Sequence, residues 1–242
     1  MEDNQINTGH ISASMSESIS EVKSLTLEMA GNVEASYASA LAGLIKGESE
    51  LSHNVATHDF TINNYEIDID EKCNTLLALR TPVASDLRTI IVILRIITDL
   101  ERVGDEAEKI ARLSLKLNYE NIDPSFLKSL EHLGNSTSLA LNRSIDAYAR
   151  KSVEDAFEVI AQDKKVDIEY EACMRQLISY IVKFEDNKVV KNFIDISTCA
   201  KSIERIGDHA KNIAQHTIYL IKGKDVRHTS IEQVRSEIEE LF

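Results

Sequence analysis

The sequence has few of the residues that make tight turns. Only two prolines and eight glycines occur in 242 residues, tryptophan is absent, and aromatic residues make up 5% of the chain. This composition leaves little turn chemistry for a β-sandwich or a barrel and suits long helices. No strand-like alternation of apolar and polar residues appears either. With 43% apolar and 28% charged residues, the chain is expected to be an ordinary all-α globular protein.

Cysteine and long apolar runs are also scarce. The three cysteines, Cys73, Cys173 and Cys199, form no CxxC pair, so neither a disulfide framework nor a zinc–thiolate site is indicated. The N-terminus lacks the basic and apolar segments of a signal peptide. The most apolar run, 90–97, is interrupted by Arg95 and is far shorter than the ~20 residues that span a bilayer. We therefore expect a cytoplasmic protein that inserts into no membrane directly.

Positive charge is in short supply. The chain has 27 Lys and Arg residues against 40 Asp and Glu residues, which gives a formal net charge of −13. Binding to nucleic acid requires clustered Lys and Arg to neutralise phosphates, so nucleic acid is not an expected ligand. An anionic membrane surface is excluded as a charge-driven partner for the same reason. An acidic surface instead suits cations or basic patches on other proteins.

Apolar residues at spacings of three and four predict six long helices of roughly 25–35 residues each. The first ten or so residues are polar and are predicted to form a frayed tail. Gly47 ends the first helix, and the second is predicted to run as one helix to Thr81, because the residue before a proline avoids the α region. Pro82 suits the first turn of the third helix, with Thr81 as a possible cap. The pattern restarts after 118–124.

One acidic segment occurs twice. The sequence Glu-Arg-x-Gly-Asp at 101–105 returns at 204–208, with the same offset of 103 residues for its neighbours. Core packing requires only apolar residues of suitable volume, so a repeat that keeps its charges indicates more than a core. In each copy the Glu and the Asp are four residues apart and lie on one face of a helix.

Hairpin geometry places a second polar pair level with each of these acidic pairs. The first hairpin is centred on Pro82 and the second between positions 185 and 186. The predicted neighbours are Asp59 with Asp105, Asn63 with Glu101, Asp163 with Asp208, and Asp167 with Glu204. All lie beside apolar stripes and are therefore partly buried. Three or four such carboxylates repel one another unless a cation or protons intervene.

We therefore hypothesise one metal site in each half of the chain. Carboxylate and amide oxygens suit Mg²⁺, Mn²⁺, Ca²⁺ or iron. His209 could add a nitrogen ligand to the second site, whereas its counterpart in the first half is Glu106. If only one half binds metal, we expect the second, because Asn63 replaces a carboxylate in the first. The alternative is that these faces are neutralised by salt bridges, with Arg102 and Arg205 one residue from the carboxylates.

A further motif, Pro82-Val-Ala-Ser-Asp-Leu-Arg88, occurs only once. The simpler interpretation is a helix N-terminus with an acidic residue in its first turns. The other is a contact surface at one end of the helical bundle.

These motifs resemble the PhoU family, the phosphate-specific transport system accessory proteins. The resemblance covers about 22–220, and its most specific parts are 82–88, 99–105 and 203–213. It implies two tandem antiparallel three-helix bundles related by a pseudo-twofold. We expect these repeats at 12–118 and 124–222, followed by a C-terminal tail at 223–242 with a short final helix at 230–241.

The resemblance also implies a regulator that restrains phosphate uptake and damps the phosphate-starvation response. The implied partners are the ATPase PstB of a phosphate ABC transporter and the sensor histidine kinase PhoR, and a homodimer is expected. Some family members bind multinuclear metal clusters through Glu/Asp-x-x-x-Asp motifs. These motifs correspond to Glu101/Asp105, Asp163/Asp167 and Glu204/Asp208, and in degraded form to Asp59/Asn63.

Catalysis is not expected from the residues. Di-iron enzymes in helical bundles use Glu-x-x-His on two helices, and the single example here, Glu50-Leu-Ser-His53, has no second copy. The phosphate-binding loops GxGxxG and GxxxxGK are also absent. A non-enzymatic adaptor is therefore the leading interpretation. A carboxylate-bridged metalloprotein or metalloenzyme, and a cytosolic metal or phosphate sensor without a transporter partner, are the alternatives.

Overall fold

A computed structural model describes residues 3–58, 60–79, 82–182, 187–227 and 229–239. All regular secondary structure in this part of the chain is helical, which confirms the predicted all-α class. The elements are α1 (Asp3–Lys46), α2 (Ser49–His58), α3 (Phe60–Leu79), α4 (Ala84–Ser114), the 3₁₀ turn η1 (Tyr119–Asn121), α5 (Pro124–Arg150), α6 (Val153–Ile181), α7 (Asn187–Lys222) and α8 (Ile231–Glu239).

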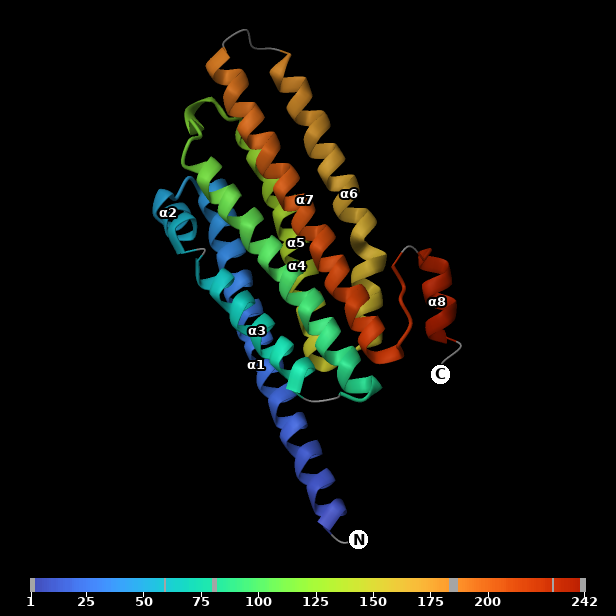
Figure 1. Cartoon of the computed structure of the whole chain (residues 1–242). Coiled ribbons are helices and arrows are strands. Elements are labelled where there is room, and N and C mark those ends of the chain that lie inside the picture. Colours follow the sequence, from blue (N-terminus) through green and yellow to red (C-terminus); the bar gives the residue numbers. More distant parts are fainter. Residues whose placement is uncertain (1–2, 59, 80–81, 183–186, 228, 240–242) are drawn as a thin grey trace.

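The helices form two bundles that lie side by side (Figure 1). In the first, α1, α3 and α4 pack together with the short α2 against α1 and α4. In the second, α5, α6 and α7 pack together. The bundles meet mainly where α4 and α7 run antiparallel through the middle of the molecule, and additionally where α1 meets α5. The prediction of two tandem three-helix units related by a pseudo-twofold is confirmed.

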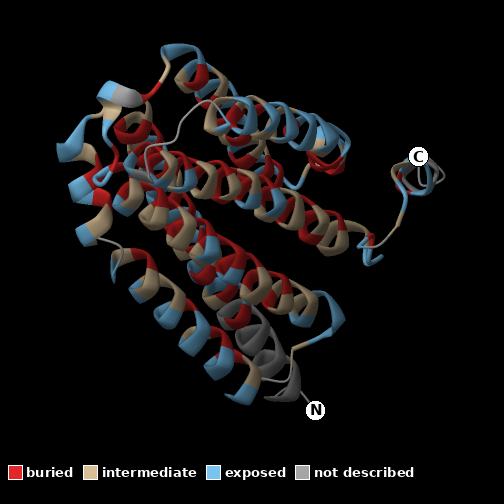
Figure 2. Cartoon of the chain, turned by 90° about the horizontal axis from the view of Figure 1, so that it is seen from above, coloured by how far each residue is buried: buried red, intermediate tan, exposed pale blue. Residues whose placement is uncertain are grey.

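One hydrophobic core is shared by both bundles. Buried residues lie on the inward faces of the long helices (Figure 2), and a single cluster of buried apolar residues contains members of both halves. Tyr37 of α1 and Phe126 of α5 are among its largest fully buried side chains. The Tyr37 hydroxyl also donates to the carbonyl oxygen of Gly134 at 3.2 Å, which joins α1 to α5. A smaller cluster lies where α8 packs on α6.

Local chemistry explains where several helices begin and end. Gly47 has a φ of +69° and ends α1, in a conformation that glycine adopts without the strain of a Cβ. Asp123 caps α5 by accepting from the backbone N–H of Ser125 at 2.7 Å, and Pro124 occupies the first turn. Between the bundles, the amide of Asn192 in α7 both donates to and accepts from the backbone of residue 118. The linker at 118–124 is therefore held against the second bundle.

Three predicted boundaries were wrong. The single helix predicted between Gly47 and Thr81 is divided into α2 and α3, which point in different directions (Figure 1). Helix α1 begins at Asp3, not after a frayed tail, because 3–46 contains no proline to stop it. Helix α4 begins at Ala84 with Val83 at its N-cap, so Pro82 precedes the first turn. Thr81, the suggested cap, lies outside the described residues.

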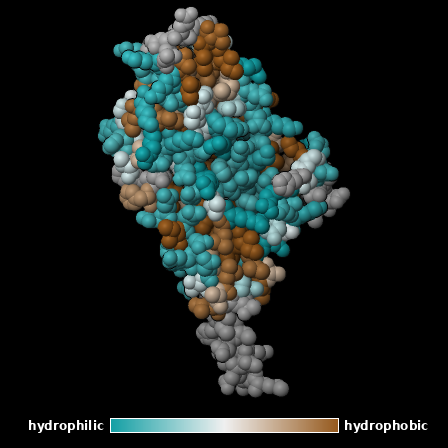
Figure 3. All heavy atoms as spheres, turned by 45° about the horizontal axis from the view of Figure 1, so that its top comes forward, coloured by the Kyte–Doolittle hydropathy of each residue, from teal (hydrophilic) through white to brown (hydrophobic). Residues whose placement is uncertain are grey.

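The surface is mostly polar, with apolar atoms concentrated toward the two ends of the face seen in Figure 3. Exposed large apolar residues include Leu79, Val83 and Leu87 around the α3–α4 connection, and Ile178 and Val182 at the far end of α6. No helix in the described ranges is long and apolar enough to cross a membrane.

Candidate functional site

The acidic residues predicted to cluster in the second half lie between α6 and α7. Asp163 and Asp167 come from α6, and Glu204 and Asp208 come from α7. Partial burial and the charges of Glu204 and Asp163 raise the pKa of Asp208. Burial and the charges of Asp163 and Glu204 likewise raise the pKa of Asp167. The structure therefore brings these four carboxyl groups close enough to repel one another.

Two lysines partly neutralise this cluster. Lys211 donates a hydrogen bond to Asp163, and Lys201 Nζ lies 2.5 Å from Glu204 Oε2. Although burial opposes the charge of Lys211, the hydrogen bond to Asp163 and the charge of Asp208 raise the pKa of its ammonium group. Four carboxylates against two ammonium groups leave two negative charges unmatched when all are ionised.

The side chains are not arranged as a preformed ligand set. Within the described ranges, no three His, Cys, Asp or Glu side chains converge closely enough to hold a metal ion. The salt-bridge alternative is thus the arrangement seen here. A cation would have to displace the ammonium groups of Lys201 and Lys211 before the carboxylates could converge on it. The donor set of oxygens still suits a hard divalent cation, and metal binding stays a prediction.

The first-half cluster is less complete. Asp59 lies outside the described residues. Asn63 is half-buried on α3, and Glu101 is only 18% exposed on α4. Arg102 lies between two of the predicted ligands, with Nε 3.4 Å from Glu101 Oε2 and Nη1 3.7 Å from Asp105 Oδ2. Burial raises the pKa of Asp105, and the charge of Arg102 opposes this.

One acidic residue of α3 near this cluster, Glu66, was missed by the sequence reasoning. Burial raises the pKa of Glu66, which is also influenced by the charges of Arg102, Asp70 and Asp105. Glu66 and Asp70 are themselves four residues apart, so the spacing that identified the other pairs was present here. The sequence analysis paired residues at equal distances from Pro82, and this pairing identified Asp59 and Asn63 as the neighbours of Asp105 and Glu101.

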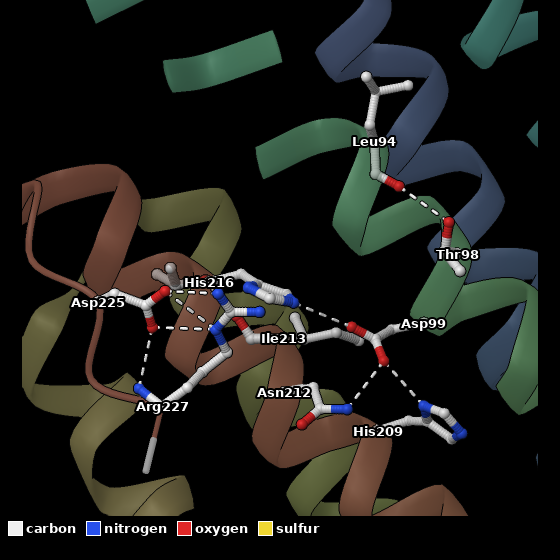
Figure 4. Close-up of polar contacts among 10 residues, drawn as sticks. Leu94, Thr98, Asp99, His209, Asn212, Ile213, His216, Asp225 and Arg227 are labelled. Carbon is white, nitrogen blue, oxygen red and sulfur yellow. Dashed lines mark hydrogen bonds and ion pairs between the residues drawn. The ribbon is translucent and has the colours of Figure 1, made fainter. Parts of the chain in front are cut away.

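His209 does not face the carboxylates of the second cluster. Its Nδ1 lies 2.8 Å from Oδ1 of Asp99, a residue of α4 that is only 8% exposed (Figure 4). Asn212 donates to the same oxygen at 3.0 Å, and His216 Nε2 lies 3.3 Å from the other carboxylate oxygen. Although burial favours the protonated acid, the hydrogen bonds from His209, His216 and Asn212 lower the pKa of Asp99. This buried carboxylate, rather than a metal site, is where the structure places His209.

A related contact lies elsewhere along the α4–α7 interface. Glu106 occupies the position in the first repeat that His209 occupies in the second, and Ser202 similarly matches Asp99. The Arg205 guanidinium donates to Glu106 with Nη1 2.8 Å from Oε1. Burial favours the protonated form of Glu106, but the Ser202 hydroxyl and Arg205 lower the pKa of this carboxyl group. Helix α4 of the first repeat thus contributes the acidic side chain of both contacts, and α7 of the second repeat contributes the donors. These donors are imidazoles and an amide for Asp99 and a guanidinium for Glu106.

These features define a class: an all-α protein of two pseudo-symmetric bundles, with acidic residues between paired helices and polar contacts between its repeats. The family model for the PhoU domain matches residues 26–114 and again residues 130–217. The chain belongs to the PhoU family.

Similar proteins and solved structures support this family assignment. The chain is 40% identical to the phosphate-specific transport system accessory protein PhoU homolog of Pseudomonas aeruginosa over 96% of this chain and 95% of that protein. It is 37% identical to the Escherichia coli accessory protein PhoU, covering 93% and 92% of the two chains. The crystal structure of PhoU from Pseudomonas aeruginosa aligns with a TM-score of 0.82 at 39% identity, covering 86% of this chain and 99% of that one. PhoU from Streptococcus pneumoniae aligns with a TM-score of 0.80 at 25% identity, covering 88% and 99%.

Proposed function

We propose that this protein is a non-enzymatic regulatory adaptor in phosphate homeostasis, which restrains phosphate uptake and damps the phosphate-starvation response. The observation that carries the proposal is the match of both repeats to the PhoU domain, together with similarity over nearly the whole chain to relatives named as phosphate transport accessory proteins. Its partners are the PstB-like ATPase of a phosphate ABC transporter and a PhoR-like sensor histidine kinase. Both present cytoplasmic surfaces, so the adaptor acts in the cytoplasm.

Co-purification tests this proposal. The full-length protein carrying an affinity tag is recovered under mild conditions from cells of its own organism, grown with excess or limiting phosphate. We expect the transporter ATPase and the kinase to be enriched over a tagged unrelated protein, in amounts that change with phosphate supply. Deleting the gene is expected to raise phosphate uptake in phosphate-rich medium. Recovery of neither partner, together with unchanged uptake, would refute the adaptor role.

We further propose that the carboxylates of the second half, Asp163, Asp167, Glu204 and Asp208, bind a divalent cation such as Mn²⁺, Mg²⁺ or ferrous iron. The support is the unmatched negative charge of the cluster and the raised pKa values of Asp167 and Asp208. The ion would replace the ammonium groups of Lys201 and Lys211 and link α6 to α7. Its role is to stabilise this helix pair or to connect it to a partner.

Metal retention tests the second proposal. The purified protein is incubated with Mn²⁺ or Fe²⁺, desalted and analysed for bound metal, beside Glu204→Gln/Asp208→Asn. The matched control is Asp68→Asn/Glu71→Gln, which removes two exposed charges from α3. We expect the wild type and the control to retain metal and the α7 variant to lose it. Absence of metal from the wild type, with the α7 variant more stable than wild type in every buffer, would refute the site.

A further inference from the structure

A cleft of about 440 Å³ lies between α4, α7 and the segment that follows α7. Its volume is within the ~300–1,000 Å³ typical of small-molecule sites. The polar side chains that line it include Arg95, Thr98 and Asp99 from α4, Asn212 and His216 from α7, and Arg227 from the segment before α8. It is separate from the acidic cluster between α6 and α7.

Arg95 is the unusual member of this cleft. Its Nη1 atom is buried and has no hydrogen-bond partner within the described ranges. The guanidinium lies over the ring of Tyr219, 5.4 Å from the ring centroid, and this contact supplies no hydrogen-bond acceptor for Nη1. A buried donor without a partner costs about 1–3 kcal/mol, and a charged donor costs more. Arg95 is therefore a cationic donor with capacity for an additional acceptor.

Two further arginines lie near Arg95. The Arg88 guanidinium also lies over the Tyr219 ring, 5.9 Å from the ring centroid. Arg227 lines the cleft and is held by Asp225, with Nε 2.9 Å from Oδ1 and Nη2 2.5 Å from Oδ2 (Figure 4). Two guanidinium groups thus lie over one tyrosine, and a third lines the cleft with Arg95, in a chain whose net charge is −13. Like charges placed together are destabilising unless an anion lies near them.

The two carboxylates nearby form their hydrogen bonds with other side chains than Arg95. Asp225 is engaged by Arg227, which lowers the pKa of its carboxyl group to about 2. Asp99 is engaged by His209, Asn212 and His216. The charge of Asp225 also acts on Arg95, but no carboxylate in the described part of the chain accepts a hydrogen bond from Arg95 Nη1. This donor is therefore left for a ligand from solution.

We propose that this cleft binds a tetrahedral oxyanion, with Arg95 as its central donor and Arg88 and Arg227 as supporting charges. The planar fork of a guanidinium matches the oxygens of phosphate in distance and direction. The ligand is inorganic phosphate or the phosphoryl group of a monoester, which share this chemistry. The assignment gives Arg88, the last residue of the motif at 82–88, a role at the end of the bundle. It goes beyond the proposed adaptor function and requires neither a metal nor a partner protein.

Equilibrium dialysis against labelled inorganic phosphate tests the proposal. The full-length protein is first treated with chelator and exchanged into a buffer free of phosphate and sulfate, at constant ionic strength. We expect saturable binding that Arg95→Gln weakens about 10- to 100-fold, as expected for losing hydrogen bonds to a charged group. Arg150→Gln, which removes an exposed charge from α5, is the matched control and is expected to bind like wild type.

Two variants give effects of opposite direction. Arg95→Lys keeps the charge but loses the fork, and we expect binding several-fold weaker than wild type. Asp225→Asn removes the carboxylate that competes for Arg227, and we expect binding several-fold tighter. If Arg95→Gln does not fold, these two variants decide the question, because unchanged affinity in both would overturn the proposal.

The remaining outcomes are also decisive. The absence of saturable binding to wild type, or equal binding by Arg95→Gln and Arg150→Gln, would overturn the site. Glu204→Gln/Asp208→Asn is expected to bind phosphate like wild type, and a loss there would assign the binding to the acidic cluster instead. Competition with phosphoserine distinguishes the two sources. Displacement by both ligands supports a phosphoryl site, whereas displacement by inorganic phosphate alone supports a site for the free ion.

Discussion

Replacing Asp99 by asparagine tests how much the buried contact between the two repeats contributes to stability. Asp99 receives hydrogen bonds from His209 and Asn212 on one oxygen and pairs with His216 on the other. Asparagine keeps one carbonyl acceptor, but its amide group replaces the second acceptor and the negative charge is lost. The imidazole of His216 would then face a donor, and the contact would be only half satisfied.

The expected loss in unfolding free energy is about 2–4 kcal/mol, because hydrogen bonds to charged groups contribute about 1.5–3 kcal/mol each and part of the contact survives. For a chain of this length, that loss corresponds to a decrease in Tm of about 4–16 °C. Urea unfolding followed by circular dichroism measures the free energy directly. The matched control is Asp146→Asn, an exposed residue of α5 with Arg150 at 3.7 Å, for which a change within about 0.5 kcal/mol is expected.

The direction in which the stabilisation by Asp99 changes with pH can also be predicted. The folded state lowers the pKa of Asp99 below its ordinary value of 3.8. Stabilisation from this carboxylate is therefore fully present above the ordinary value and is lost as the pH falls through the lower folded value. The difference between wild type and Asp99→Asn should be fully developed above about pH 5 and should shrink in stronger acid. A difference below about 0.5 kcal/mol at neutral pH, or one that grows on acidification, would refute the reasoning.

Two further predictions concern packing and thiol burial. A Cβ added at Gly43 would lie 2.1 Å from the Ser52 hydroxyl oxygen, so Gly43→Ala should lower the unfolding free energy by about 1–3 kcal/mol. Nothing lies within 4 Å of a Cβ added at Gly31, and Gly31→Ala should stabilise α1 by up to about 1 kcal/mol; urea midpoints measure both, and equal effects would contradict the packing. Burial raises the pKa of Cys73 and of Cys199 to about 12, so native protein at pH 8 should react slowly with a thiol reagent and rapidly after unfolding. Fast labelling of folded protein would contradict this burial.

The class of fold was predictable because apolar periodicity continues over long helices. Gly47, Pro82 and the linker at 118–124 mark the junctions α1–α2, α3–α4 and α4–α5. The division of the predicted second helix was not predictable in the same way. Helix α2 is held by a buried hydroxyl pair, with the Ser52 and Ser114 oxygens 2.6 Å apart. A contact between two serines leaves no apolar signal in the sequence.

The second acidic cluster was found by counting because α6 and α7 are long and their hairpin keeps its register. The first was less well predicted, since register counted from Pro82 did not identify Glu66 as a neighbour of Asp105. The partner of His209 was missed for a different reason. Asp99 lies in the other repeat, and the packing of α4 on α7 depends on the tertiary fold and not on the spacing within one helix.

The continuous core has a mechanical consequence for the adaptor role proposed above. Because α4 and α7 are packed together within one apolar cluster, the two repeats have no hinge of their own between them. The shared core therefore holds the surfaces at the two ends of the molecule at a fixed separation. If the proposed adaptor contacts two partners, it would present both surfaces at once, at the separation that the shared core sets.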